Sequence, residues 1–259
     1  MADSLPVDSL DQEYLFFASL APGATQKRLA LVVVLILITA FFITAGPLSS
    51  VPLPQIEAFV PAYATAMFLN DTVIAVLLFG QFLVLRSRAL MVIACGYLFA
   101  ALMMIPWVLT FPGTFVSAEL FGAGPQSPTS FYILRHVGFP LLVIAYSLLK
   151  DADGSVSKNP GREAALSIIS VVVFVAAAAY VVITQDALLP QFMVDAVHPS
   201  VHLSRYLIST GLLSVTALIV LWIRRHSVLD LWLTVVMCAY IIEILLISFP
   251  VPNRFSMGW

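Results

Sequence analysis

Charged side chains are scarce in this sequence: Asp, Glu, Lys and Arg make up 10% of its 259 residues, whereas hydrophobic residues make up 61%. A soluble domain averages about 25% charged and about 45–50% apolar residues. The formal net charge of −2 also lacks the basic excess that nucleic-acid binding needs, so we expect no nucleic-acid partner. The composition therefore predicts an integral membrane protein whose main partner is the lipid bilayer.

Cysteine and histidine are rare as well, with two and four residues. Cys95 and Cys238 lie inside apolar stretches and in no metal-ligand spacing, which favours packing roles over a disulfide framework. Four histidines are too few for a multi-histidine di-iron membrane oxygenase. The sequence also lacks a nucleophile motif, a phosphate-binding loop or a paired-carboxylate motif in a convincing context. We therefore expect no enzyme activity within this chain and no metal site.

Positive charge is missing from the first twenty residues, which contain acidic residues such as Asp3 and Glu13 but no lysine or arginine. A cleavable signal peptide begins with a positively charged segment, so none is predicted. Residues 1–24 are interpreted as a cytoplasmic lead-in, and residues 25–259 as a membrane-embedded domain.

Long apolar stretches dominate the rest of the chain. About 20 apolar residues cross the hydrocarbon core as a helix, and continuous stretches of this length exclude the shorter alternating strands of a β-barrel. Short linkers predict antiparallel neighbours, and hence an all-α bundle of seven transmembrane helices. The predicted spans are Leu29–Ala45, Ala62–Leu85, Ala89–Phe111, Phe131–Leu149, Ala164–Ile183, Tyr206–Ile223 and Val228–Phe249.

The basic residues predict the orientation of these spans, because cytoplasmic flanks carry an excess of Lys and Arg. With the N-terminus in the cytoplasm, nine of the twelve basic residues lie at the inner ends of the spans. The outer flanks hold only Arg135, Arg205 and Arg254. Seven spans then place Trp259 outside.

Ionisable residues gather in the outer half of the predicted bundle, whereas the cytoplasmic half offers only charges at helix ends. A charged group in hydrocarbon costs about 2.5–3.5 kcal/mol on insertion scales, so it normally faces a bundle interior or a wet cavity. At ~1.5 Å per residue, Asp71 lies about 14 Å inside the outer end of its span, and His136 and Glu243 lie within about 9 Å of theirs. The candidates for a ligand or signal pocket are Asp71, Arg135, His136, Glu243, Arg205 and His202.

These candidates also fit other interpretations. Arg135 and Arg205 have side chains long enough to reach the outer headgroups, and either can pair with an intramembrane acid to join two helices. His202 and His198 fit an ordinary linker. Two other functions stay open: proton or cation transport through Asp71 and Glu243, and haem binding by His136 with His202 or His198. The lack of duplicated halves with matching broken helices weakens the transporter hypothesis.

Several stretches occur in an order that is typical of one known family. They are 52–63, Asn70-Asp71, 77–88, 96–103, 109–113, His136-x-Gly138-Phe-Pro140, 227–243 and 254–259. In these stretches the chain resembles the MASE group of membrane-associated sensor domains, specifically its fourth described type. The resemblance covers roughly residues 25–259 and implies a bacterial inner-membrane input domain that regulates a cytoplasmic histidine kinase or diguanylate cyclase. It implies a homodimer and supplies no cofactor.

The implied cytoplasmic output conflicts with an external Trp259. We therefore expect an eighth span beyond the chain end, and we interpret the chain as the sensor region of a longer protein.

Overall fold

The computed structural model describes residues 20–46, 48, 58–112, 114, 122–150, 159–185, 188–195 and 198–248. Within these ranges the regular structure is helical apart from one isolated bridge between Met193 and Pro199. Seven of the described helices are long and apolar enough to span a membrane, which confirms the predicted all-α bundle. They are α2 (Ala24–Ala45), α3 (Phe59–Leu85), α4 (Arg88–Thr110), α5 (Ser127–Leu149), α6 (Pro160–Thr184), α7 (Leu203–Ile223) and α8 (Val228–Ser248).

Several helices begin earlier than the apolar stretches that predicted them. The helix α2 begins at Ala24 instead of Leu29, and α5 begins at Ser127 instead of Phe131. The first turns of these helices, before the apolar stretches begin, contain polar residues, such as Gln26 and Lys27 in α2. A polar first turn is helical without being apolar, so hydropathy alone places the start of such a helix too late.

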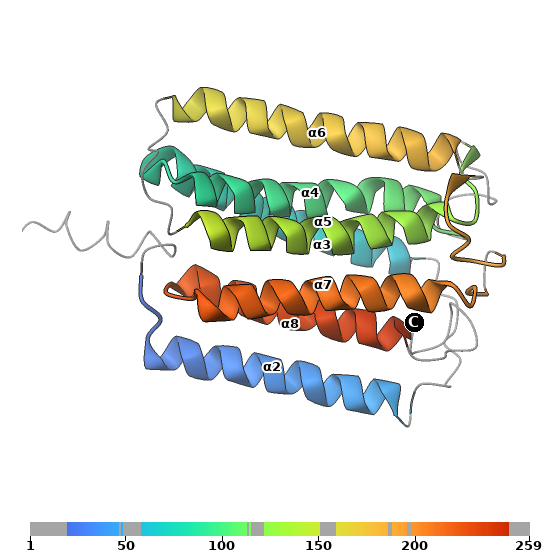
Figure 1. Ribbon diagram of the computed structural model, residues 1–259, viewed down its shortest axis with the longest axis horizontal. Helices are drawn as coiled ribbons and strands as arrows, with labels where there is room; N and C mark the ends of the chain where they lie inside the picture. The colour runs from blue at the N-terminus through green and yellow to red at the C-terminus, as the bar shows by residue number, and fades with distance from the viewer. Residues whose placement is uncertain are drawn as a thin grey trace, which may run out of the picture.

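The helices run side by side along one direction, as Figure 1 shows. The centre is formed by α4 with α3 and α5 packed against it, and α6 covers α4 on one side. On the other side α7 packs against α5 and α8, and α2 contacts α8 at the edge of the bundle. The edge helices α2 and α6 are exposed over most of their length, as expected for helices that face lipid.

Small residues let α4 and α5 approach closely at the centre. A Cβ atom placed on Gly138 would lie 2.4 Å from Cε1 of Phe99, and one placed on Gly96 would lie 3.3 Å from Cβ of Leu142. Both distances are shorter than ordinary van der Waals contact, so larger side chains would force the helices or Phe99 to move. Gly138 lies two residues after His136, and this close packing fixes the outer half of α5 against α4.

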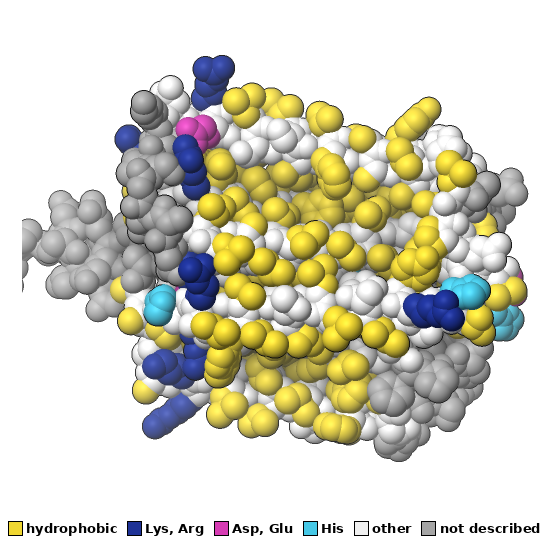
Figure 2. All heavy atoms as spheres, viewed as in Figure 1, with side chains coloured by type: hydrophobic (Ala, Val, Ile, Leu, Met, Phe, Trp, Pro, Cys, Tyr) yellow, Lys and Arg dark blue, Asp and Glu magenta, His cyan; other side chains and the backbone are white. Residues whose placement is uncertain are grey.

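The two ends of the bundle differ in charge. In Figure 2 the Lys and Arg side chains gather mainly at the end where α2 begins, and hydrophobic side chains cover the middle. By the positive-inside rule this end is cytoplasmic. Most of the predicted lead-in (residues 1–19) lies outside the described residues, as do residues 249–259.

Candidate functional site

Asp71 and Arg135 form an ion pair between α3 and α5. The distance from Nη2 of Arg135 to Oδ2 of Asp71 is 3.1 Å, and each residue is only 5% exposed. The guanidinium of Arg135 also lies 5.2 Å from the centre of the Tyr240 ring on α8. Arg135 therefore pairs with the buried acid, and the alternative in which it extends to the headgroups is wrong.

His136, the next residue along α5, contacts Glu243 on α8. Nε2 of His136 lies 3.2 Å from Oε2 of Glu243; the imidazole is buried, whereas the Glu243 side chain is 34% exposed. Nδ1 of His136 lies 2.9 Å from the carbonyl oxygen of Tyr132. A carbonyl oxygen only accepts hydrogen bonds, so we assign the Nδ1 proton from this contact.

This assignment limits the charge of the His136–Glu243 pair. With Nδ1 protonated, Nε2 attracts the carboxyl group of Glu243 only if one further proton is present. If that proton lies on Nε2, His136 is positive and Glu243 is negative. If it lies on Glu243, both residues are neutral. In both forms the two residues together carry no net charge, and the same is true of Asp71 with Arg135. Neutral pairs are what a membrane interior favours, because an isolated charge there is costly. We call Asp71, Arg135, His136 and Glu243 the outer cluster.

Aromatic rings enclose the outer cluster and border a small cavity. The Tyr132 ring stacks on His136 with a centroid distance of 4.0 Å, and the Tyr240 ring lies 4.8 Å from it. The cavity has a volume of about 30 Å³, room for only a few non-hydrogen atoms. The hydroxyl of Tyr132, Nε of Arg135 and Nε2 of His136 are buried there without a hydrogen bond among the described residues, although Nε2 of His136 lies near the Glu243 carboxylate. The cavity is lined by Tyr63, Met103, Met104, Trp107, Phe131, Tyr132, Arg135, His136 and Glu243.

The structure does not bring Arg205 and His202 into the outer cluster. Both side chains are exposed at the start of α7, and no contact joins them to the cluster. His198 is exposed too, and its Nδ1 lies 2.8 Å from Oδ2 of Asp195 in the same linker. The two ring nitrogens of His136 face the carbonyl oxygen of Tyr132 and the carboxylate of Glu243.

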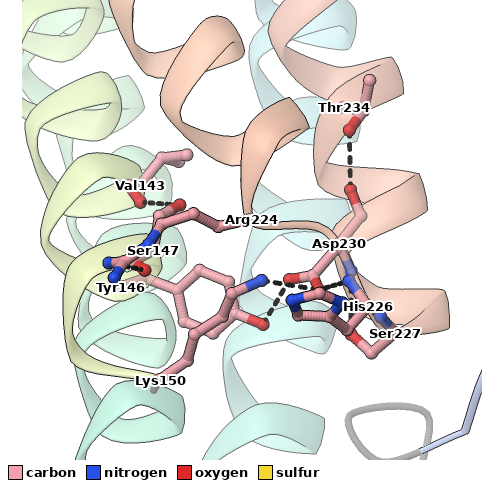
Figure 3. Close-up of polar contacts among 9 residues, drawn as sticks. All are labelled: Val143, Tyr146, Ser147, Lys150, Arg224, His226, Ser227, Asp230 and Thr234. Carbon is pink, nitrogen blue, oxygen red and sulfur yellow. Dashed lines mark hydrogen bonds and ion pairs between the residues drawn. The ribbon is translucent and has the colours of Figure 1, made fainter. Parts of the chain in front are cut away.

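A second buried polar group lies near the cytoplasmic end, where the sequence predicted only terminal charges (Figure 3). Asp230 of α8 is 1% exposed. Its Oδ1 accepts a hydrogen bond from the Tyr146 hydroxyl at 2.7 Å, and its Oδ2 lies 2.8 Å from Nζ of Lys150, the residue that follows α5. We call Tyr146, Lys150 and Asp230 the inner link. Asp230 and Lys150 both lie at helix ends, as expected from the sequence, but their burial and pairing were not predicted.

The turn between α7 and α8 completes the inner link. The backbone N–H groups of His226 and Ser227 donate to Oδ2 of Asp230 at 2.8 and 3.0 Å, and Oγ of Ser227 accepts from the backbone N–H of Asp230 at 3.2 Å. This reciprocal pattern is a capping box at the start of α8. The spacing Ser227-x-x-Asp230 is its signal in the sequence, but the spacing does not reveal that Tyr146 and Lys150 approach the same carboxylate.

The helix α5 contributes residues to both polar groups. His136 and Lys150 are fourteen positions apart, which corresponds to about 21 Å along a helix and a rotation of about 40°. They therefore lie on nearly one face of α5, and both contact α8. One rigid helix thus connects the outer cluster to the cytoplasmic end.

Comparison with known proteins agrees with the resemblance noted in the sequence. Residues 54–259 match the MASE4 family, described as a membrane-associated sensor, integral membrane domain. The helix α2 precedes the matched range. Comparisons with curated proteins and with solved structures gave no match. Because the family match covers most of the chain and the seven helices fit a multi-pass inner-membrane protein, the chain belongs to the MASE4 family and is a membrane sensor input domain.

Proposed function

We propose that the outer cluster receives the stimulus and that α5 transmits it to the inner link near the cytoplasmic surface. The observation that carries this proposal is the position of four polar side chains along one helix or at its end. Arg135 and His136 contact acids on α3 and α8 near the middle of α5. Tyr146 and Lys150 contact Asp230 at the cytoplasmic end, where the backbone carbonyl of Ser147 accepts a hydrogen bond from Arg224.

Transmission needs two arrangements of α5 whose balance the stimulus changes. A packed helix moves as a unit, by small shifts or rotations against its neighbours. A shift of α5 that separates His136 from Glu243 therefore also changes the distance from Lys150 to Asp230. The stimulus acts on α5 only if it interacts differently with these two arrangements.

The cavity favours a very small stimulus. Its volume of about 30 Å³ admits a few atoms, and the hydroxyl of Tyr132 and Nε of Arg135 offer donors to it. Nε2 of His136 lies 3.2 Å from Oε2 of Glu243, and Glu243 is partly exposed. We propose that the stimulus is a proton gained or lost by this pair, or a small hydrogen-bond acceptor that enters the cavity.

We propose that the output is a cytoplasmic histidine kinase or diguanylate cyclase in the same polypeptide, and that the sensor acts as a homodimer. Membership of a sensor family supports a regulated output module. The inner link supports a cytoplasmic one, since it lies at the end of the bundle where basic residues gather.

We propose that the sensor works without a cofactor. Haem needs a ring nitrogen aimed at the iron, and both nitrogens of His136 face oxygens of Tyr132 and Glu243. A visible absorption spectrum of the purified protein tests this directly. We expect no Soret band, and a Soret band that is lost in His136→Ala would overturn the proposal.

The proposed function is tested in the full-length protein with its output module, by measuring output activity in membranes. Asp71→Asn, His136→Ala and Glu243→Gln each alter the outer cluster, so we expect each to change the output several-fold at equal protein levels. Arg205→Gln is the matched control, because Arg205 is an exposed basic residue at the same end of the bundle. If all three cluster variants signal like the wild type, the outer cluster is not the input site.

A further inference from the structure

A large groove lies between α2, α8 and the end of α7, away from the outer cluster. Its volume is about 700 Å³. Its walls are apolar where the two long helices face each other, with Leu31 and Val34 on α2 and Leu231, Val235 and Cys238 on α8. The contact of Ala30 with Leu231 and Val235 holds α2 against α8 beside the groove.

The mouth of the groove is basic. Lys27, near the start of α2, and Arg225, just after α7, both line it and are exposed. The guanidinium of Arg225 lies 3.4 Å from the centre of the Trp222 ring, which holds it in place by a cation–π contact. Neither basic residue forms an ion pair with an acidic side chain in the part of the chain that the structure describes. The mouth therefore presents two unneutralised positive charges at the cytoplasmic end.

We propose that this groove binds one anionic phospholipid from the cytoplasmic leaflet, with its headgroup at Lys27 and Arg225 and an acyl chain along the apolar wall. The combination identifies the occupant, because the basic mouth fits a phosphodiester and the apolar wall fits hydrocarbon. A free phosphate ion would leave the wall uncovered. A zwitterionic lipid would leave the two positive charges without a matching net negative charge.

The groove adjoins the inner link, so an occupant lies next to the output end of the sensor. His226 and Ser227 line the groove, and their backbone N–H groups donate to Asp230 (Figure 3). A headgroup bound at the turn between α7 and α8 therefore contacts the backbone that holds Asp230. This second site is independent of the proposed stimulus in the outer cavity.

Native mass spectrometry of the purified full chain tests the site. The protein is titrated in detergent with phosphatidylglycerol or phosphatidylcholine, and the fraction that retains lipid is measured. We expect one phosphatidylglycerol per chain in preference to phosphatidylcholine. Lys27→Gln/Arg225→Gln should lower its affinity by about tenfold. Arg88→Gln/Arg162→Gln is the control, since it removes the same charge from exposed residues at the same end and should bind like the wild type.

A second pair of variants tests whether an acyl chain enters the groove. Cys238→Trp places an indole against the apolar wall and should abolish retention, whereas Leu212→Trp adds the same ring to an exposed position of α7 and should not. Size-exclusion chromatography confirms that each variant is folded, and a misfolded Cys238→Trp is replaced by Cys238→Phe.

Several results would overturn the proposal. Equal retention of the two lipids, or unchanged retention in Lys27→Gln/Arg225→Gln, removes the headgroup site. Unchanged retention in the folded Cys238 variant removes the acyl-chain site. Displacement of the lipid by millimolar glycerol phosphate would identify an anion site that is open to water. A lipid-free dimer that dissociates in the groove variants would identify a second copy of the chain as the occupant.

Discussion

Arg135 and His136 are consecutive residues of α5, yet they pair with acids on two different helices. Arg135 contacts Asp71 on α3 at 3.1 Å, and His136 contacts Glu243 on α8 at 3.2 Å. Consecutive residues of a helix point about 100° apart, so one side chain extends toward α3 and the other toward α8, although α5 packs mainly against α4 and α7. Two neutral pairs thereby join three helices in the outer half of the membrane.

Substitutions of Asp71 and Arg135 should have strongly non-additive effects on the free energy of unfolding. Asp71→Leu alone leaves Arg135 charged and buried, so we expect a loss of about 3–5 kcal/mol in the free energy of unfolding. The double variant Asp71→Leu/Arg135→Met removes both charges and should lose less than Asp71→Leu alone. Unfolding of the protein in detergent measures these differences. Arg205→Gln is the control, and its free energy of unfolding should change by no more than about 0.5 kcal/mol. If the loss in the double variant equals the sum of the losses in the two single variants, the two residues are not coupled.

The His136–Glu243 pair should tolerate a neutral replacement of the acid. The amide of Glu243→Gln can donate an N–H to Nε2 of a neutral His136, so we expect a loss of about 1 kcal/mol or less. His136→Ala removes a buried ring and leaves Glu243 without its partner, so we expect a loss of about 3 kcal/mol. The same unfolding measurement compares them. Equal losses in the two variants would mean that a neutral amide cannot replace the carboxyl group of Glu243 beside His136.

The sequence predicts the depth of the outer cluster better than its pairing. The constant rise of a helix predicts similar depths for Asp71, His136 and Glu243, and in the structure His136 contacts Glu243 while Asp71 contacts the neighbouring Arg135. The choice between Arg135 and Arg205 as the partner of Asp71 depends on which helices are neighbours and how each is rotated. A single sequence with seven similar apolar stretches does not contain that information.

The inner link shows a second reason why the sequence alone does not predict the whole of the polar structure. Asp230 stands in the first turn of α8, where an acid is normally a capping residue exposed to water. Its burial arises because the end of α5 brings Tyr146 and Lys150 onto the same carboxylate. Long-range packing of this kind has no local sequence signal, although the capping box at Ser227 does.

Asp230 should be more important for stability than either of its side-chain partners. Asp230→Ala leaves the buried hydroxyl of Tyr146, Nζ of Lys150 and backbone donors without an acceptor, so we expect a loss of at least about 3 kcal/mol. Lys150→Met keeps the other donors and should cost about 1–2 kcal/mol.

A matched acid is available as a control for Asp230. Glu163 lies in the first turn of α6 but is not buried, so Glu163→Ala should change the stability by less than about 1 kcal/mol. If Glu163→Ala and Asp230→Ala prove equally costly, the effect is general helix capping and not the inner link.

Gly138 should not accept a side chain. Gly138→Ala places Cβ against the Phe99 ring at the contact between α4 and α5, so we expect a loss of about 1–3 kcal/mol. Gly80→Ala is the matched control, because Gly80 lies inside α3 and a Cβ atom there would have no neighbour within 4 Å. Alanine at this position should be neutral or stabilising by about 0.5–1 kcal/mol. Thermal unfolding of both variants distinguishes packing from intrinsic helix propensity.

The central claim is that α5 couples the outer cluster to the inner link, and a double-mutant cycle on output activity tests it most directly. His136→Ala, Asp230→Asn and the double variant are compared in the full-length protein, at equal levels in the membrane. If one helix carries the signal, the double variant should show the output of Asp230→Asn alone, because the outer change no longer reaches the output. If the two effects on the logarithm of output activity simply add, the two sites act independently and the coupling through α5 is contradicted.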